Sequence, residues 1–100
     1  MKRHLIYCGL QAEGMTEQQA GQLVRDLAIT HLPSGHTIHE ATGRWAGMLG
    51  PVDEATLVVE AWEMVGFDKP NLVGLIADYK ELAKQEAVVM LTTPCEAVVF

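Results

Sequence analysis

The stretch TEQQAGQLVRDLA, residues 16–28, decides how this sequence is expected to fold. It begins with a capping box, because the Thr16 hydroxyl can accept from the Gln19 amide while the Gln19 side chain reaches back. Apolar side chains then recur at spacings of three and four residues, as on one face of an amphipathic helix. These are Ala20, Leu23, Val24, Leu27 and Ala28. The helix should end by residues 31–32, because Pro33 disfavours a helical residue before it.

A second amphipathic helix is expected in the last third of the chain. With Asp68 as N-cap, Pro70 lies in the first turn, where its missing N–H costs nothing. Phe67 and Leu72 then flank the cap as a hydrophobic staple. The apolar stripe consists of Leu72, Leu75, Ile76, Tyr79, Leu82 and Ala83. This pattern predicts that Tyr79 packs in the core.

Two strands are expected around the first helix. Residues 4–10 are apolar on both faces, as in a strand from the middle of a sheet. Residues 37–45 are β-prone but half polar, which is typical of an edge strand. Residues 46–53 contain two glycines and a proline, so we interpret them as a hairpin connection.

Two further strands follow the hairpin. Residues 54–63 place Leu57, Val59 and Ala61 on one face, which predicts a second interior strand. Residues 87–91 form the next strand. Because Pro94 cannot donate a ladder hydrogen bond, this strand must bend there, lie on an edge, or break, with residues 95–100 as a second piece.

The order strand-helix-strand, strand-helix-strand defines the fold class. Two such halves joined by a hairpin form the β-α-β-β-α-β, ferredoxin-like α+β arrangement. We expect residues 1–100 to be one domain with a four-stranded antiparallel sheet and both helices on one face. The other face then has no cover from this chain.

The charge balance excludes one class of partner. Thirteen acidic and seven basic residues give a net charge of −6 and a pI near 5.0. Nucleic-acid binding needs a basic surface that displaces counterions from phosphate, so no nucleic-acid partner is expected. No segment approaches the ~20 apolar residues of a membrane span, and no targeting segment is recognised. These features predict a cytoplasmic protein with no membrane partner.

The cysteines and histidines do not predict a metal site or a cofactor. Cys8 and Cys95 should be reduced thiols, although their sulfurs could approach each other if the first and last strands are neighbours. His36 and His39 are three residues apart on an expected strand, so they point to opposite faces and cannot share one ion. We expect His31 to cap the carbonyls at the end of the first helix.

Several short motifs resemble an uncharacterised family of small bacterial and phage proteins, over roughly residues 5–100. The carrying segments are Leu32-Pro33-Ser34-Gly35-His36-Thr37, Gly43-Arg44-Trp45, Gly50-Pro51-Val52-Asp53-Glu54, Tyr79-Lys80, Gln85-Glu86-Ala87-Val88-Val89 and Pro94-Cys95 through Phe100. The resemblance implies a ferredoxin-like fold and supplies no activity.

Aromatic residues interleaved with polar ones mark the candidate binding site. They are Tyr7, His39, Arg44, Trp45, Glu54, Glu60 and Trp62. Several should share the uncovered sheet face, where Arg44 would pair with Glu54 or Glu60 across strands. An arginine beside a tryptophan can hold an anionic or planar ligand. The alternatives are that Trp45 and Trp62 pack against a second copy, or that this is ordinary surface.

Three functional hypotheses follow. The leading one is a non-catalytic, self-associating binding module for a protein or small ligand, most simply a homodimer through the open sheet face. The second is a small cofactor-independent enzyme of the dimeric α+β-barrel type, with His39, Glu54 and Tyr7 as candidate acid or base groups. The third is a phage-encoded antagonist of a host protein or signal molecule.

Overall fold

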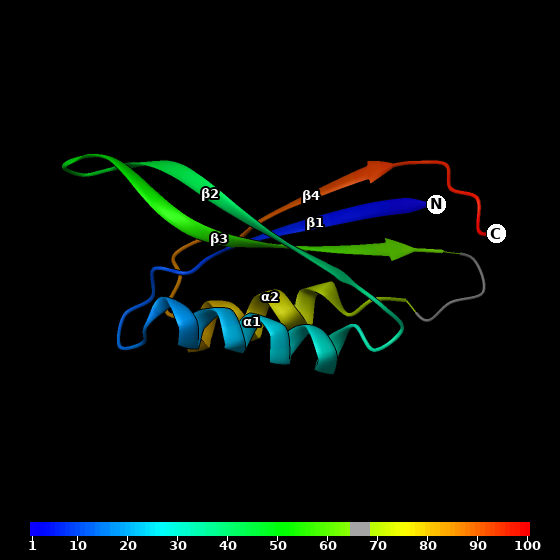
Figure 1. The fold of residues 1–100 in the computed structure, drawn as a ribbon, viewed down its shortest axis with the longest axis horizontal. Coiled ribbons are helices and arrows are strands. Elements are labelled where there is room, and N and C mark those ends of the chain that lie inside the picture. The colour runs from blue at the N-terminus through cyan, green and yellow to red at the C-terminus, as the bar shows by residue number, and fades with distance from the viewer. Residues whose placement is uncertain (65–68) are drawn as a thin grey trace.

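The computed structural model describes residues 1–64 and 69–100. Its elements are β1 (Lys2–Gly9), α1 (Glu17–His31), β2 (Thr37–Gly47), β3 (Gly50–Glu63), α2 (Leu72–Leu82) and β4 (Val89–Pro94). This is the expected β-α-β-β-α-β order. Figure 1 shows both helices under the same side of the sheet, as the sequence predicted.

The four strands form one antiparallel sheet in the order β2-β3-β1-β4. The two most apolar strands, β1 and β3, are therefore interior, and the half-polar β2 is an edge strand. Ile6 of β1 is opposite Val59 of β3, and both point to the helices. The alternate residues, such as Tyr7 opposite Val58, point to the other side of the sheet, which we call the open face.

Helix α1 has the capping box expected from the sequence. The Thr16 hydroxyl accepts from the Gln19 amide at 3.1 Å, and the Gln19 side chain accepts from the Thr16 amide at 2.9 Å. The expected start of the second helix was wrong. Its N-cap is Asn71, which accepts from the Gly74 amide at 3.0 Å. The expected cap at Asp68 lies outside the described residues.

The β2–β3 hairpin is longer than expected. The ladder continues to Gly47 opposite Gly50, so only Met48 and Leu49 remain in the turn. The interpretation of residues 46–53 as a connection was therefore wrong. Gly50 has φ +119°, a conformation that L side chains rarely adopt, and it closes the tight turn. The extended hairpin projects beyond the sheet at the left of Figure 1.

The C-terminal segment follows one of the three expected alternatives, because β4 is an edge strand of the sheet. Strand β4 begins at Val89, and Pro94 is its last residue, opposite Lys2. Residues 95–100 form no strand, although the Cys95 amide donates to the Met1 carbonyl at 3.1 Å. Cys8 is near the opposite end of β1, so the two cysteines do not approach one another.

The core lies between the sheet and the helices. It contains the predicted stripe of α1, the inner residues of β1 and β3, and Leu75 and Tyr79 of α2. His31 does not cap carbonyls as expected. It bonds Asp78 of α2 through Nε2 at 2.7 Å, which links the two helices. Among residues 1–64 and 69–100, no helix is long and apolar enough to cross a bilayer.

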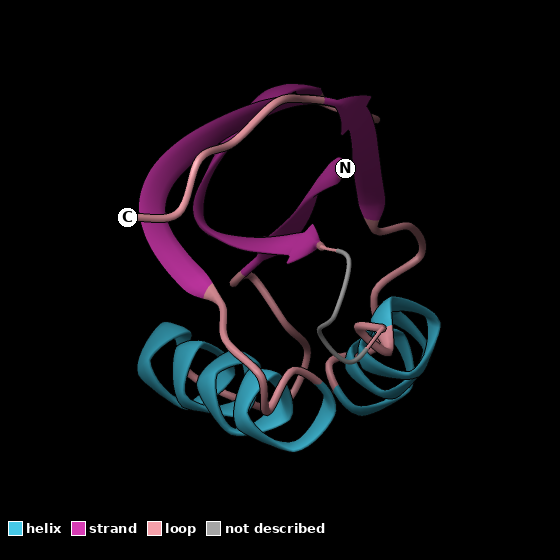
Figure 2. Cartoon of the chain, turned by 90° about the vertical axis from the view of Figure 1, so that its right-hand side faces the viewer, coloured by secondary structure: helices cyan, strands magenta, loops and turns pink. Residues whose placement is uncertain are grey.

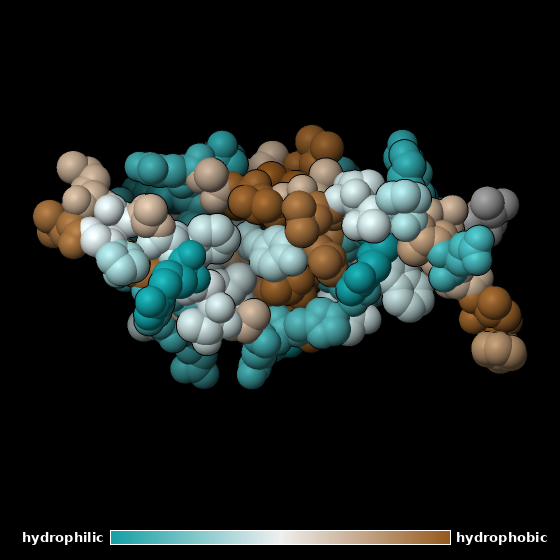
Figure 3. Space-filling model, turned by 90° about the horizontal axis from the view of Figure 1, so that it is seen from above, coloured by the Kyte–Doolittle hydropathy of each residue, from teal (hydrophilic) through white to brown (hydrophobic). Residues whose placement is uncertain are grey.

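The open face is less bare than the sequence suggested. Figure 2 shows the sheet strongly curved, so that its edge strands rise around the interior ones. Val58 and Glu60, which point away from the helices, are only 7% and 8% exposed. Apolar side chains gather in the middle of this face (Figure 3), and they include the half-exposed Val89 and Leu91.

A buried carboxylate joins three strands on the open face. Glu60 Oε1 accepts from Arg3 Nε at 2.6 Å and from Trp62 Nε1 at 3.2 Å, while its Oε2 accepts from His39 Nε2 at 2.8 Å. The hydrogen bond from His39 and the contacts with Arg3 and Trp62 lower the pKa of Glu60 to about 2, although burial opposes the shift. We call these four residues the Glu60 cluster.

The Glu60 cluster should make the protein sensitive to acid. Because the folded-state pKa lies below the unfolded value, its contribution is complete above about pH 4.5 and is lost as the pH falls towards 2. Replacing Glu60→Gln should lower the free energy of unfolding at pH 7 by about 2 kcal/mol. Urea unfolding from pH 7 to pH 2.5 tests this. The exposed Glu40→Gln control should follow the wild type, and parallel curves for all three proteins would contradict the expectation.

Candidate functional site

A hollow of about 500 Å³ opens where the hairpin leaves the sheet. Its wall is formed by the end of β1, both strands of the hairpin and the loop between α2 and β4. The lining includes the side chains of Tyr7, Trp45, Val52, Glu54, Lys84, Glu86 and Val89. We call this hollow the Glu54 pocket. Its size is within the range of small-molecule sites.

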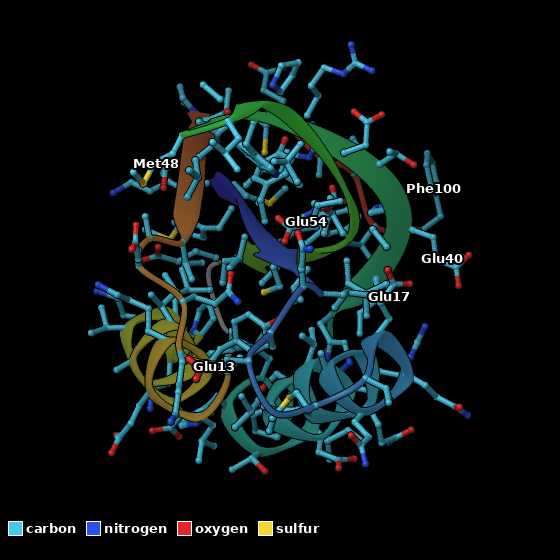
Figure 4. The ribbon with its side chains drawn as sticks, turned by 90° about the vertical axis from the view of Figure 1, so that its left-hand side faces the viewer. Glu13, Glu17, Glu40, Met48, Glu54 and Phe100 are labelled. Atoms are coloured by element: carbon cyan, nitrogen blue, oxygen red, sulfur yellow. The ribbon has the colours of Figure 1, made fainter. Side chains whose placement is uncertain are left out.

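Glu54 lies over a residue that has no side chain. A Cβ built on Gly9 would stand 2.1 Å from Glu54 Oε1, so only glycine leaves room for the carboxylate there. Glu54 Oε2 also accepts from the Gln11 amide at 3.3 Å. Figure 4 shows Glu54 beside the end of β1, within the curve of the sheet. The carboxylate is therefore held over the end of β1 at the floor of the pocket.

A second glycine gives space to the aromatic wall. Gly43 is opposite Glu54 in the ladder, and a Cβ on it would stand 2.8 Å from the Trp45 indole nitrogen. The Trp45 ring therefore lies back over Gly43. Since Trp45 is 43% exposed, it presents an accessible aromatic surface beside the carboxylate.

The remaining wall is the loop after α2. Lys84, which follows the helix C-cap Ala83, has φ +51°. Gln85 Nε2 donates to the Gln11 carbonyl at 3.0 Å, which attaches the loop to the segment after β1. Lys84 and Glu86 are exposed and line the pocket from this loop. The pocket thus combines two carboxylates, one ammonium group and two aromatic side chains, Tyr7 and Trp45.

The predicted site residues separate into three places. Tyr7, Trp45 and Glu54 line the Glu54 pocket. His39, Glu60 and Trp62 belong to the Glu60 cluster on the same face.

Arg44 lies apart from both groups. It lies on the other side of the hairpin and binds Asp53 in a bidentate pair, at 2.6 and 3.0 Å. The expected pair with Glu54 or Glu60 was wrong, because residues 44 and 53 are direct partners in the ladder. Arg44 is also 70% exposed along its side chain, so it does not contribute to the pocket.

Sequence reasoning missed the glycine and the loop. Gly9 interrupts an otherwise apolar strand, and a strand glycine often marks a close approach of another group. The register of β1 and β3 places Thr56 opposite Gly9. Only the tertiary structure shows that the Glu54 side chain lies over Gly9 and that the loop is attached to the segment after β1.

A second hollow, of about 400 Å³, lies at the opposite end of the sheet near Trp62. Several of its polar groups are already engaged. His31 binds Asp78 and receives a hydrogen bond from the Asn71 amide group, and Glu60 is held by its own cluster. The Glu54 pocket is therefore the stronger candidate.

Comparison with known proteins gives structural neighbours only. No family model matches the chain, and no curated protein sequence matches it. Among solved structures it is similar to a phage SAM lyase without ligand, with a TM-score of 0.64 and 19% identity over 92% of this chain and 78% of that one. A phage SAM lyase in complex with S-methyl-5′-thioadenosine gives a TM-score of 0.67 and 18% identity, over 92% and 79% of the two chains.

These neighbours correct the functional expectation. The fold is a ferredoxin-like α+β fold, as predicted, and small phage proteins share it. However, those proteins are enzymes, whereas the resemblance had indicated a family without assigned activity. The leading hypothesis of a non-catalytic binding module is therefore wrong, and the enzyme alternative fits better.

The arrangement at Gly9 can be tested without any ligand. Replacing Gly9→Ala should displace the Glu54 carboxylate, because the new Cβ would occupy its position. The Gln11 amide resonance should then move towards its position in Glu54→Ala. Gly21→Ala is the control, because its Cβ meets only Leu57 and Leu10 at 3.7 and 3.8 Å. An unchanged Gln11 resonance in folded Gly9→Ala would refute the arrangement.

Proposed function

We propose that this chain is an enzyme that cleaves S-adenosylmethionine (SAM) in the Glu54 pocket and releases S-methyl-5′-thioadenosine. The observation that carries the proposal is the match between the charges of the pocket and those of SAM. The fold shared with phage SAM lyases supports it. The pocket volume of about 500 Å³ suits a nucleoside with a short side chain.

The charges of the pocket complement SAM group by group. SAM has a sulfonium, an ammonium and a carboxylate, and the pocket has Glu54, Glu86 and Lys84. The two carboxylates attract the two cations, and the ammonium group of Lys84 attracts the carboxylate. Trp45 offers an aromatic face to the adenine or the sulfonium. Val52 and Val89 complete an apolar wall.

If SAM is cleaved without water, only a few reactions can follow the breaking of its carbon–sulfur bond. When the bond between sulfur and the γ-carbon of the amino acid breaks, its electron pair stays on sulfur and neutralises the sulfonium. The γ-carbon then replaces the lost bond with one formed inside the substrate. In the first route the SAM carboxylate attacks this carbon and gives a lactone. In the second route the next carbon loses a proton and a double bond forms, which gives an alkene. Glu54 can orient the ammonium group in the first route and accept the proton in the second.

The activity test is direct. Purified protein incubated with SAM should release S-methyl-5′-thioadenosine, and proton NMR of the four-carbon product distinguishes a lactone from an alkene. Replacing Glu54→Gln should lower kcat/KM by about 10²–10³-fold, since it keeps the shape but removes the charge. Glu40→Gln is the control, because Glu40 is exposed on the other side of β2. Absence of S-methyl-5′-thioadenosine with the wild-type protein would refute the proposal.

We also propose that the chain works in the cytoplasm and that it self-associates as a homodimer through the part of the open face around Leu91 and Trp62, which do not line the Glu54 pocket. The support is the apolar middle of this face, where Leu91 is 50% and Trp62 is 49% exposed. Light scattering should give twice the chain mass at micromolar concentration, and Leu91→Glu should give the monomer mass. A wild-type monomer at 100 μM would exclude the dimer.

A further inference from the structure

We propose that Tyr79, in the core of α2, is a positioning residue for the Glu54 pocket. It acts through the Gly9 carbonyl on the backbone over which the Glu54 carboxylate lies. This inference rests on the proposed function for its catalytic consequence, whereas its structural part stands on contacts within the chain. The sequence pattern assigns Tyr79 to packing, and the packing is present, since the residue is fully buried.

The first step is the hydrogen bond between Tyr79 and Gly9. Pairing of β1 with β4 ends at Tyr7 opposite Val89, so Gly9 lies beyond the end of β4. The Tyr79 hydroxyl donates to the Gly9 carbonyl. A helix side chain thus supplies the donor at a point of β1 that β4 does not reach.

The second step connects Gly9 to the carboxylate. Glu54 Oε1 occupies the space where a Gly9 Cβ would stand, and Glu54 Oε2 accepts from the amide of Gln11, two residues on. The carboxylate therefore touches the same short segment that Tyr79 holds. Gln85 holds this segment a second time, through the Gln11 carbonyl at 3.0 Å. A shift of residues 9–11 would therefore change both the space and the amide donor that hold the carboxylate.

The Tyr79 phenol keeps its proton, which it needs as a hydrogen-bond donor. Burial raises the pKa of the Tyr79 phenol, and the nearby Cys8 and Glu54 raise it further. The phenol therefore stays protonated at neutral pH and acts as a hydrogen-bond donor. The Tyr79 hydroxyl therefore fixes the Gly9 carbonyl, and any proton transfer to or from the substrate is made by the exposed groups of the pocket.

Replacing Tyr79→Phe tests the hydroxyl alone, because phenylalanine keeps the ring that packs in the core. When a catalytic carboxylate is displaced by a fraction of an ångström, the rate of the chemical step falls more than the affinity for the ground state does. We expect kcat for SAM to fall about tenfold. The affinity for S-methyl-5′-thioadenosine, measured by calorimetry, should change less than about twofold, since this neutral product does not need the charge of Glu54.

The control variant is Ile76→Val, which removes one methyl group from a partly buried side chain of the same helix. Ile76→Val should lower the melting temperature about as much as Tyr79→Phe does, and it should leave kcat unchanged. A kcat that is unchanged in Tyr79→Phe, or that falls equally in Ile76→Val, would overturn the positioning role while leaving the proposed function intact.

A second readout is independent of activity. The Gln11 amide resonance reports its hydrogen bond to Glu54, and it should move in Tyr79→Phe and stay fixed in Ile76→Val. If the wild-type protein does not cleave SAM, the proposed function fails and this resonance still decides the structural part. An unmoved Gln11 resonance in folded Tyr79→Phe would overturn that part as well.

Discussion

The close approach of the Glu54 carboxylate to Gly9 is the constraint on which the candidate site depends. It requires an interior strand, β1, that lacks a side chain at one position, and a neighbouring strand whose register places a carboxylate beside that position. It also requires β1 to continue beyond the end of β4, so that Tyr79 reaches the Gly9 carbonyl. The position of the Glu54 carboxylate thus depends on the packing, the strand register and the strand length around Gly9.

The curvature of the sheet explains why its open face carries both charge and apolar surface. A flat sheet with helices on one side leaves its other side to solvent or to a partner. Here the rising edge strands shield Val58 and Glu60, and the buried charge of Glu60 is matched by donors from β1, β2 and β3. The Glu60 cluster thus holds three strands together, while the Glu54 pocket keeps its carboxylate accessible to a ligand.

Local sequence signals predicted the elements well where their cause is local. The capping box at Thr16, the stripe of α1 and the interior character of β1 and β3 are confirmed, because each depends on neighbours a few residues apart. The start of α2, the length of the hairpin and the partner of Arg44 were wrong. The last two depend on cross-strand register, which spacing along the chain does not contain.

The sequence by itself determined the order of the elements, the inner faces of the helices and strands, and the acidic balance that argues against a nucleic-acid partner. It also pointed to Tyr7, Trp45 and Glu54 as site residues. Only the tertiary structure decided that these three line one pocket together with Gly9 and the loop from Lys84 to Ala87. The physical reason is that a pocket is made by segments far apart in the chain, and their distances are fixed by register and packing.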